Sequence, residues 1–203
     1  MSVQNRLRSI RVAAVAASVL VPATADAAIT FSGVTGAFPA APYVEGGFTV
    51  TATQGTWVHS SGYGNPEPSI FAGPIGNPGV STIEVTGGTF TFDGLDISSN
   101  NGTSTYSFTG FLGAAQVYSL VDLAPAEPGG DGVFNFTDIA SGTTAVMDKL
   151  VITITPGTGV SSVNIDNIGV TAASVTVPEP ASLALLGFGL LGLAAAARRR
   201  AAA

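Results

Sequence analysis

The segment Ser81-Thr82-Ile83-Glu84-Val85-Thr86-Gly87-Gly88-Thr89-Phe90-Thr91-Phe92-Asp93 contains the pattern that decides the fold. On both sides of Gly87-Gly88, apolar side chains alternate with polar ones, and both phenylalanines fall on one face. Such alternation is typical of a β-strand with one buried face. A Gly-Gly pair between two alternating runs is a hairpin signal. We therefore expect two antiparallel strands joined by a tight turn at Gly87-Gly88.

Similar short segments recur along the chain, separated by turn residues such as Asn100-Asn101-Gly102. Besides 81–86 and 89–93, which continues to 97, the candidate strands are 29–31, 47–53, 104–111, 115–121, 133–136, 150–155 and 163–171. Between these strands, 140–149 has room for one short helical turn, and 54–79 is a Gly/Pro/Asn/Ser-rich stretch that is either functional or locally folded. The sequence predicts a single all-β sandwich or jelly-roll domain of about eight or nine strands.

The N-terminal segment has the three parts of an export signal. Arg6, Arg8 and Arg11 form a basic region, residues 12–21 are apolar, and Ala25-Asp26-Ala27 offers small residues for cleavage after Ala25 or Ala27. The apolar run is too short for a membrane span, so it predicts a removable signal peptide.

The C-terminal segment also has three parts. Val177, Pro178, Glu179 and Pro180 form a motif whose prolines hold the residues before them extended. The 17 uncharged residues that follow, 181–197, are near the lower limit for a transmembrane helix. Arg198, Arg199 and Arg200 complete the segment as a basic stop, which favours the cytoplasmic side of a membrane.

This arrangement resembles the PEP-CTERM sorting tail of exported proteins of Gram-negative bacteria. The resemblance implies an exosortase-type membrane protease or transpeptidase as a partner, and transient anchoring of the chain in the inner membrane. It also implies a destination at the cell surface or in an extracellular polysaccharide matrix. We thus expect a signal peptide at 1–27, a β-sandwich domain at 28–176 and a sorting signal at 177–203. A permanent anchor that is never cut is the alternative.

Charge and composition exclude several classes of function. Between the two terminal signals, Lys149 is the only basic residue against 11 carboxylates, a net charge of about −10. A basic face for nucleic acid or anionic lipid is therefore absent from the sequence, whereas divalent cations suit an acidic exported domain. The chain contains no cysteine, which excludes disulfides, thiolate metal sites and a cysteine nucleophile.

Catalytic residues are hard to assign. His59 is the only histidine, and it lies outside any Gly-x-Ser-x-Gly motif. Paired carboxylates, such as Asp93 with Asp96 or Asp122 with Asp131, are the remaining route to an enzyme, a polysaccharide-acting hydrolase. Turn formation is the simpler use of these aspartates, and we expect a non-catalytic protein.

The domain itself is similar to PEP-CTERM exported proteins with a carbohydrate-binding-like jelly roll. The similar segments are Tyr43-Val44-Glu45-Gly46-Gly47-Phe48, Phe90-Thr91-Phe92-Asp93, Phe108-Thr109-Gly110 and Ile165-Asp166-Asn167-Ile168. The resemblance implies a structural Ca²⁺ held between Glu45 and Asp166, with Asn167 beside the second.

Glycan recognition requires exposed aromatic rings beside hydrogen-bonding groups. Trp57, Tyr63 and Tyr43 are the candidates, and Trp57 and Tyr63 are the predicted ligand-binding residues. Packing in the core is the competing role for Trp57, since a lone tryptophan in a domain of this size commonly fills core space.

Overall fold

A computed structural model of the chain describes residues 26–34, 38, 41–127 and 135–173. Within these ranges the chain forms strands joined by turns and loops, and no helix, so the predicted all-β class is confirmed. The strands are β1 (Asp26–Ile29), β2 (Tyr43–Glu45), β3 (Phe48–Gln54), β4 (Thr56–Ser60), β5 (Ser69–Gly73), β6 (Ser81–Asn100), β7 (Ser104–Leu112), β8 (Ala115–Ala124), β9 (Ala126–Glu127), β10 (Thr137–Ala140), β11 (Met147–Pro156) and β12 (Ser162–Ala172).

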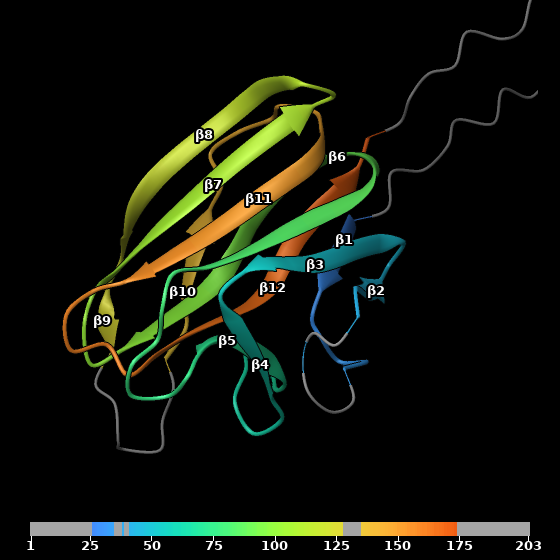
Figure 1. Ribbon diagram of the computed structural model, residues 1–203. Helices are drawn as coiled ribbons and strands as arrows, with labels where there is room; N and C mark the ends of the chain where they lie inside the picture. The colour runs from blue at the N-terminus through green and yellow to red at the C-terminus, as the bar shows by residue number, and fades with distance from the viewer. Residues whose placement is uncertain (1–25, 35–37, 39–40, 128–134, 174–203) are drawn as a thin grey trace, which may run out of the picture.

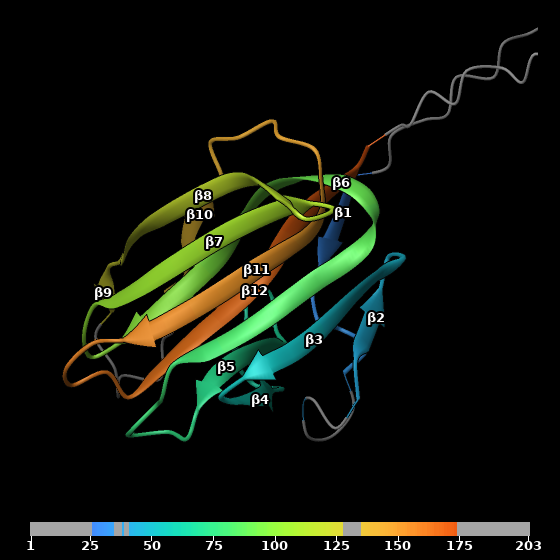
Figure 2. The same cartoon turned by 45° about the horizontal axis from the view of Figure 1, so that its top comes forward.

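The long strand β6 belongs to two layers of a sandwich. Its first half lies between β3 and β11, and β11 continues the layer through β7 to the edge strand β8. Its second half pairs with β12 on one side and with β10 and β9 on the other. The pairs β12–β5 and β5–β4 extend this second layer. Figures 1 and 2 show β6 as one green ribbon that curves from one layer into the other.

The bend occurs at Gly87-Gly88, where we had expected a hairpin. The hairpin prediction is wrong, because β6 runs as one strand from Ser81 to Asn100 through both glycines and the chain does not reverse. In the pairing of β6 with β11, Thr86 lies opposite Lys149 and Phe90 opposite Met147, so β6 carries extra residues at this point. Such a bulge bends a strand and increases its twist. Gly-Gly indicates both structures because each requires backbone angles that glycine adopts easily; Gly88 has φ +70°.

The core fills the space between the two layers. The rings of Phe92 in β6 and Phe108 in β7 pack edge to face with centroids 5.1 Å apart, and Phe48 and Phe90 pack in the same way at 5.4 Å. The inward residues are those that the alternation predicted, because successive side chains of a strand point to opposite faces. The largest fully buried side chains are Phe31, Phe90, Phe92, Phe108, Ile29, Ile70, Ile83, Leu95, Ile97, Met147, Leu150 and Ile152.

The structure corrects several predicted boundaries. The described residues form twelve strands rather than eight or nine. The stretch 54–79 is locally folded as the hairpin of β4 and β5, and 140–149 holds the end of β10 and the start of β11 instead of a helical turn. The predicted strand at 29–31 corresponds to β1, which begins earlier, at Asp26. Residue 27, the predicted end of the signal peptide, therefore lies inside β1. Cleavage after Ala25 would leave β1 whole.

We predict that Gly87→Ala destabilises the fold by at least about 2 kcal/mol, because a methyl group there overpacks the bend. An added Cβ would lie 2.8 Å from the carbonyl oxygen of Gly47 and 2.9 Å from the Cα of Phe48. Gly79→Ala is the control, since a Cβ at Gly79 meets no atom within 4 Å. Chemical denaturation of the two variants measures the difference. Equal stabilities would show that the bend does not depend on a glycine at this position.

Candidate functional site

The loop between β4 and β5, residues 61–68, is tied to the outer face of the second layer by Asn65. The backbone N–H of Asn65 donates to Asp166 Oδ2 at 2.8 Å, and its side-chain Nδ2 donates to Asp96 Oδ2 at 3.0 Å. Asn167 Nδ2 donates to the same Asp96 oxygen at 2.7 Å and to the carbonyl oxygen of Asn65. We call Asn65, Asp96, Asp166 and Asn167 the carboxylate cluster. It joins β6, β12 and the loop in one hydrogen-bonded group.

The register of β6 and β12 brings the two carboxylates together. Asp96 lies directly opposite Asp166 in the antiparallel pair, and a register shift follows between Asp166 and Gly169. Asn167, within this irregularity, has φ +47°, a left-handed conformation that asparagine tolerates better than most residues. Both carboxylates are buried, with Asp166 fully inaccessible and Asp96 8% exposed.

Burial is the main reason why the pKa of Asp166 is raised to about 6. The backbone N–H groups of Asn65 and Asn167 lower this pKa, whereas the negative charges of Asp96 and Glu45 raise it. Lys149 is the only Lys or Arg in the described ranges, and it does not pair with Asp96 or Asp166. Its Nζ lies 4.0 Å from Glu84, in the other layer. Two adjacent buried carboxylates therefore lack a positive partner within the described part of the chain.

Glu45, the other predicted metal ligand, has a different role in the structure. Its Oε2 accepts hydrogen bonds from the backbone N–H groups of Thr30 and Phe31, both at 2.9 Å, and from the Tyr43 hydroxyl at 3.0 Å. Its Oε1 accepts from the hydroxyls of Thr30 and Ser32. Glu45 thus fastens the segment after β1, where Phe31 holds an uncommon φ of +58°. The carboxylate directly beside Asp166 is that of Asp96, which the sequence reasoning had considered only as half of a hydrolytic pair.

The carboxylate cluster offers oxygen atoms of the kinds that Ca²⁺ prefers. Asp96 and Asp166 supply carboxylates, Asn65 supplies a backbone carbonyl, and Asn167 supplies an amide oxygen if its side chain turns over. In the described ranges, no group of three or more His, Cys, Asp or Glu side chains is placed to hold a metal ion. A cation here would therefore depend on the amide and carbonyl oxygens as well as on the two carboxylates.

Of the carboxylate pairs considered for hydrolysis, only Asp93 with Asp96 lies wholly within the described residues, and these two side chains are in different environments. Asp93 is exposed and accepts a hydrogen bond from the Thr171 hydroxyl at 2.8 Å, whereas Asp96 is buried in the carboxylate cluster. Asp122 is exposed on β8 and accepts from the backbone N–H of Leu123, and Asp131 lies outside the described residues. A retaining or inverting hydrolase needs two carboxyl groups facing each other across a substrate.

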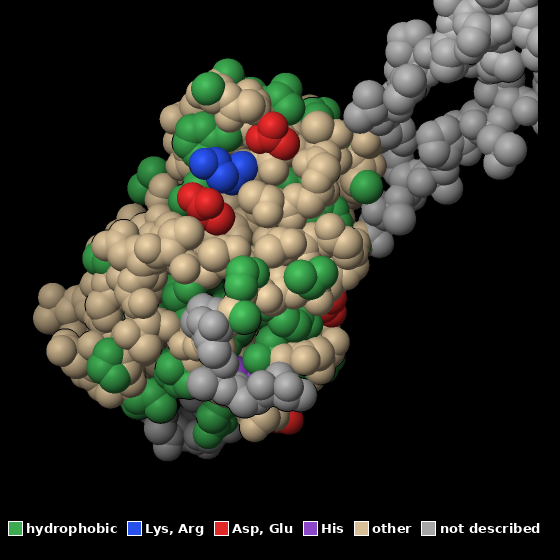
Figure 3. All heavy atoms as spheres, turned by 45° about the vertical axis from the view of Figure 1, so that its right-hand side comes forward, with side chains coloured by type: hydrophobic (Ala, Val, Ile, Leu, Met, Phe, Trp, Pro, Cys, Tyr) green, Lys and Arg blue, Asp and Glu red, His purple; other side chains and the backbone are tan. Residues whose placement is uncertain are grey.

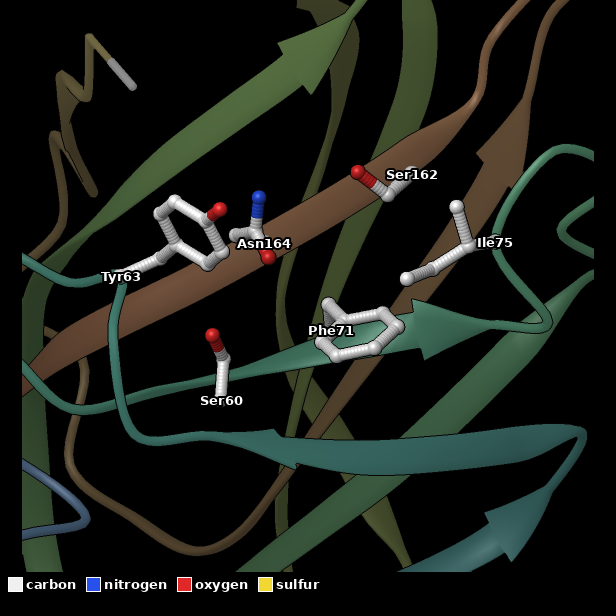
Figure 4. Close-up of a pocket in the computed structure, with 6 residues that line it drawn as sticks. All are labelled: Ser60, Tyr63, Phe71, Ile75, Ser162 and Asn164. Atoms are coloured by element: carbon white, nitrogen blue, oxygen red, sulfur yellow. The ribbon is translucent and has the colours of Figure 1, made fainter. Parts of the chain in front are cut away.

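A hollow lies next to the carboxylate cluster on the same outer face. Its empty space measures about 270 Å³, part of it open to solvent. Figure 4 shows Tyr63, from the β4–β5 loop, at one end, Ile75 at the other, and Asn164 and Ser162 projecting from β12. Six residues line it: Ser60, Tyr63, Phe71, Ile75, Ser162 and Asn164. Of these six residues, the sequence analysis predicted only Tyr63 as a ligand-binding residue.

The two predicted ligand-binding aromatics lie in different environments. Tyr63 is 44% exposed and borders the hollow. Trp57 is 2% exposed in the core, and its Nε1 donates to the carbonyl oxygen of Thr82 at 3.3 Å. The packing role therefore describes Trp57 in this structure, because its side chain is almost fully buried in the core. Tyr43 packs against Phe31 and Phe38 at the other end of the domain.

Residues 1–25 of the predicted signal peptide lie outside the described residues, and so does the whole predicted sorting signal, including the motif at 177–180 and the arginines at 198–200. The described residues include no helix long and apolar enough to cross a membrane. Because β1 pairs with the end of β12, Asp26 lies opposite Thr171, and both ends of the domain leave at one corner (Figure 1).

Comparison with known protein families identifies the C-terminal segment. Residues 176–200 match the family described as the PEP-CTERM protein-sorting motif. This match confirms the predicted sorting motif, and it implies an exported protein that is processed at the membrane. No curated protein matches the chain in sequence.

Solved structures with a similar arrangement of strands include carbohydrate-binding modules. The module CBM29_1 of Piromyces equi has 9% identity and a TM-score of 0.44, covering 76% of this chain and 94% of its own. A family 11 module of a Clostridium thermocellum cellulosomal cellulase has 11% identity and a TM-score of 0.41, covering 75% and 97%. Tailspike protein 4 of bacteriophage CBA120 has 17% identity and a TM-score of 0.39, covering 61% of this chain and 19% of its own. Similarities this distant identify neither a ligand nor an activity.

Proposed function

We propose that this protein is an exported, non-catalytic glycan-binding component of the cell surface or of an extracellular polysaccharide matrix. The sorting motif at 176–200 supports export. The observation that carries the binding function is the hollow, where an exposed aromatic ring and buried polar side chains occur together. Sugar rings present apolar C–H faces and peripheral hydroxyls, so a site for them combines an aromatic surface with hydrogen-bonding groups.

A hydrolase is the alternative function, and the described geometry favours it less. The adjacent pair Asp96 and Asp166 is roofed by the β4–β5 loop and bonded to Asn65 and Asn167, so a glycosidic bond has no access between the two carboxylates. The geometry of this pair therefore favours the binding hypothesis over the hydrolase.

A glycan-binding screen of residues 26–177, which keep β1 whole, tests the proposed function, and we expect at least one polysaccharide or oligosaccharide to bind. Tyr63→Ala should weaken that binding by about tenfold, equivalent to ~1.4 kcal/mol, because the ring surface is lost. Tyr63→Phe should keep most of the affinity. Val121→Ala, at a 63% exposed position on β8, is the control away from the hollow. A complete absence of glycan binding, or equal binding by Tyr63→Ala, would contradict a glycan site at the hollow.

We also propose that the tail is removed after export. The motif Val177-Pro178-Glu179-Pro180 would be recognised by an exosortase-type enzyme while 181–197 spans the inner membrane and 198–200 remains cytoplasmic. Extended backbone before each proline suits the cleft of a protease. Permanent anchoring, with no cleavage, is the alternative.

Mass spectrometry of the protein recovered from its natural host distinguishes these two outcomes. We expect the mature C-terminus near Pro178-Glu179-Pro180. Pro178→Ala should cause the uncut form to accumulate, whereas Ser174→Ala, just before the matched segment, should be processed normally. Mature protein that still ends in the intact tail with Arg198–Arg200 would show that the anchor is permanent.

We propose, in addition, that the carboxylate cluster binds a structural Ca²⁺. The donors would be carboxylate oxygens of Asp166 and Asp96 with amide and carbonyl oxygens of Asn167 and Asn65. Its support is the pairing of two buried carboxylates without a basic partner among the described residues, a costly arrangement that a divalent cation would relieve. The predicted participation of Glu45 stays a prediction, since its oxygens already accept five hydrogen bonds.

Calcium should raise the melting temperature of EDTA-treated protein at pH 7, by roughly 5–10 °C when its concentration is about 100 times Kd. The rise should be smaller at pH 5, because Asp166, with a pKa of about 6, is then mostly protonated and the cation must displace its proton. Asp166→Ala should abolish the rise, and Asp93→Ala, at an exposed position, should keep it. No response of the wild-type protein to calcium or chelator at pH 7 would rule out the site.

A further inference from the structure

We propose that the hollow accommodates a single uncharged sugar unit and that the side-chain amide of Asn164 selects it by hydrogen bonding. This inference rests on the proposed glycan-binding function and specifies the class of glycan. Its basis is the chemistry of the lining residues and the position of one buried donor.

The lining contains apolar and neutral polar side chains, and no charged one. Tyr63, Phe71 and Ile75 provide the apolar surface, whereas Ser60, Ser162 and Asn164 provide hydroxyl and amide groups (Figure 4). An ionised sugar entering the hollow would lose water and gain no counter-charge, which is unfavourable. An uncharged sugar would exchange hydrogen bonds with water for hydrogen bonds with these groups.

Asn164 is the most informative lining residue. Its side chain is 2% exposed, and its Nδ2 makes no hydrogen bond within the described part of the chain. A buried donor without a partner costs about 1–3 kcal/mol. The neighbouring polar side chain, Ser162, already accepts a hydrogen bond from Asn100 Nδ2 at 2.8 Å. Asn164 Nδ2 is therefore available for an acceptor oxygen of a ligand, such as a hydroxyl, ring or acyl oxygen of a sugar.

The net negative charge of the domain also favours an uncharged sugar over an anionic one. Lys149 is the only basic side chain in the described ranges, and carboxylates occur on both layers. Figure 3 shows one face of the molecule, on which the single basic side chain lies beside acidic ones and most of the remaining surface is uncharged. The carboxylate cluster adjoins the hollow, because Asp166 lies two residues from Asn164 on the same face of β12. Even with a divalent cation bound at the cluster, the domain keeps a net charge of about −8 (−10 + 2), which disfavours uronic-acid and sulfated glycans.

The hollow is small. Its empty space of about 270 Å³ includes open solvent, so only part of it is enclosed by the protein. The enclosed part leaves room for at most one sugar unit, which would lie with one face towards Tyr63 and the opposite edge towards Ile75. Further units of a chain would extend into solvent through the open side.

Titration of the full-length chain in detergent with purified oligosaccharides tests the inference. The uncharged probes are cellotetraose, mannotetraose and N-acetylchitotetraose, and the anionic probe is tetragalacturonate. We expect one or more uncharged probes to bind at least tenfold more tightly than the anionic probe. Asn164→Asp retains the shape of the side chain but replaces the donor by acceptors, so it should weaken binding of the uncharged probe by tenfold or more. Its melting temperature separates lost binding from lost folding.

A second variant keeps the inference testable if Asn164→Asp does not fold. Ile75 is 73% exposed, so Ile75→Lys should fold and place a cation at the rim of the hollow. It should increase the affinity for tetragalacturonate by tenfold or more, whereas Val121→Lys, on β8, should not. Tighter binding of tetragalacturonate than of any uncharged probe by the wild type, or no effect of either hollow variant, would overturn the inference and leave glycan binding intact. Failure of the wild type to bind any glycan would instead refute the proposed function.

Discussion

The bend of β6 at Gly87-Gly88 is the constraint on which the rest of the structure depends. The first half of this strand is paired with β3 and β11, and the second half with β12 and β10. One continuous strand thus fixes the position of each layer relative to the other, and the aromatic contacts of Phe90 and Phe92 form on the side where the layers face each other. The bend brings the apolar faces together and leaves the polar face of β6 and β12 turned outward.

That outward face would normally be solvated, but the β4–β5 loop covers part of it. Asn65 anchors the loop through two hydrogen bonds to Asp96 and Asp166, and Tyr63, two residues earlier, borders the hollow. The carboxylate cluster and the hollow are therefore both formed between β12 and the β4–β5 loop. A cation bound by both carboxylates and by the carbonyl oxygen of Asn65 would also hold the loop, so the proposed cation and the proposed glycan site are linked through Asn65.

Much of the fold could be predicted from the sequence because alternation is a local property. The segments 47–53, 104–111 and 163–171 correspond to β3, β7 and β12 within a few residues. Gly87-Gly88 was misinterpreted because a hairpin and a bulged bend use the same glycine conformations, and only the partners of the strand distinguish them.

The candidate site was less predictable, because it depends on pairing between distant residues. Asp96 and Asp166 are brought together by the register of β6 and β12, which local patterns do not specify. Glu45 was predicted as a metal ligand together with Asp166; in the structure it accepts the N–H groups of Thr30 and Phe31, and its charge also raises the pKa of Asp166. Asn164 offered no signal, since an asparagine in a strand becomes notable only when its burial and its unused donor are known.

The path of β12 relates the proposed binding site to the sorting tail. Asn164 and Ala172 lie near opposite ends of this strand, and at about 3.3 Å per residue they are roughly 26 Å apart. Ala173, the last residue before the undescribed segment, is bonded to Thr89 at the end of the sandwich where β1 also begins. The chain therefore leaves the domain at the end remote from the hollow. If the tail holds the protein at a membrane before processing, the proposed site lies roughly 26 Å along β12 from the point where the tail begins, so attachment at that point leaves the hollow uncovered.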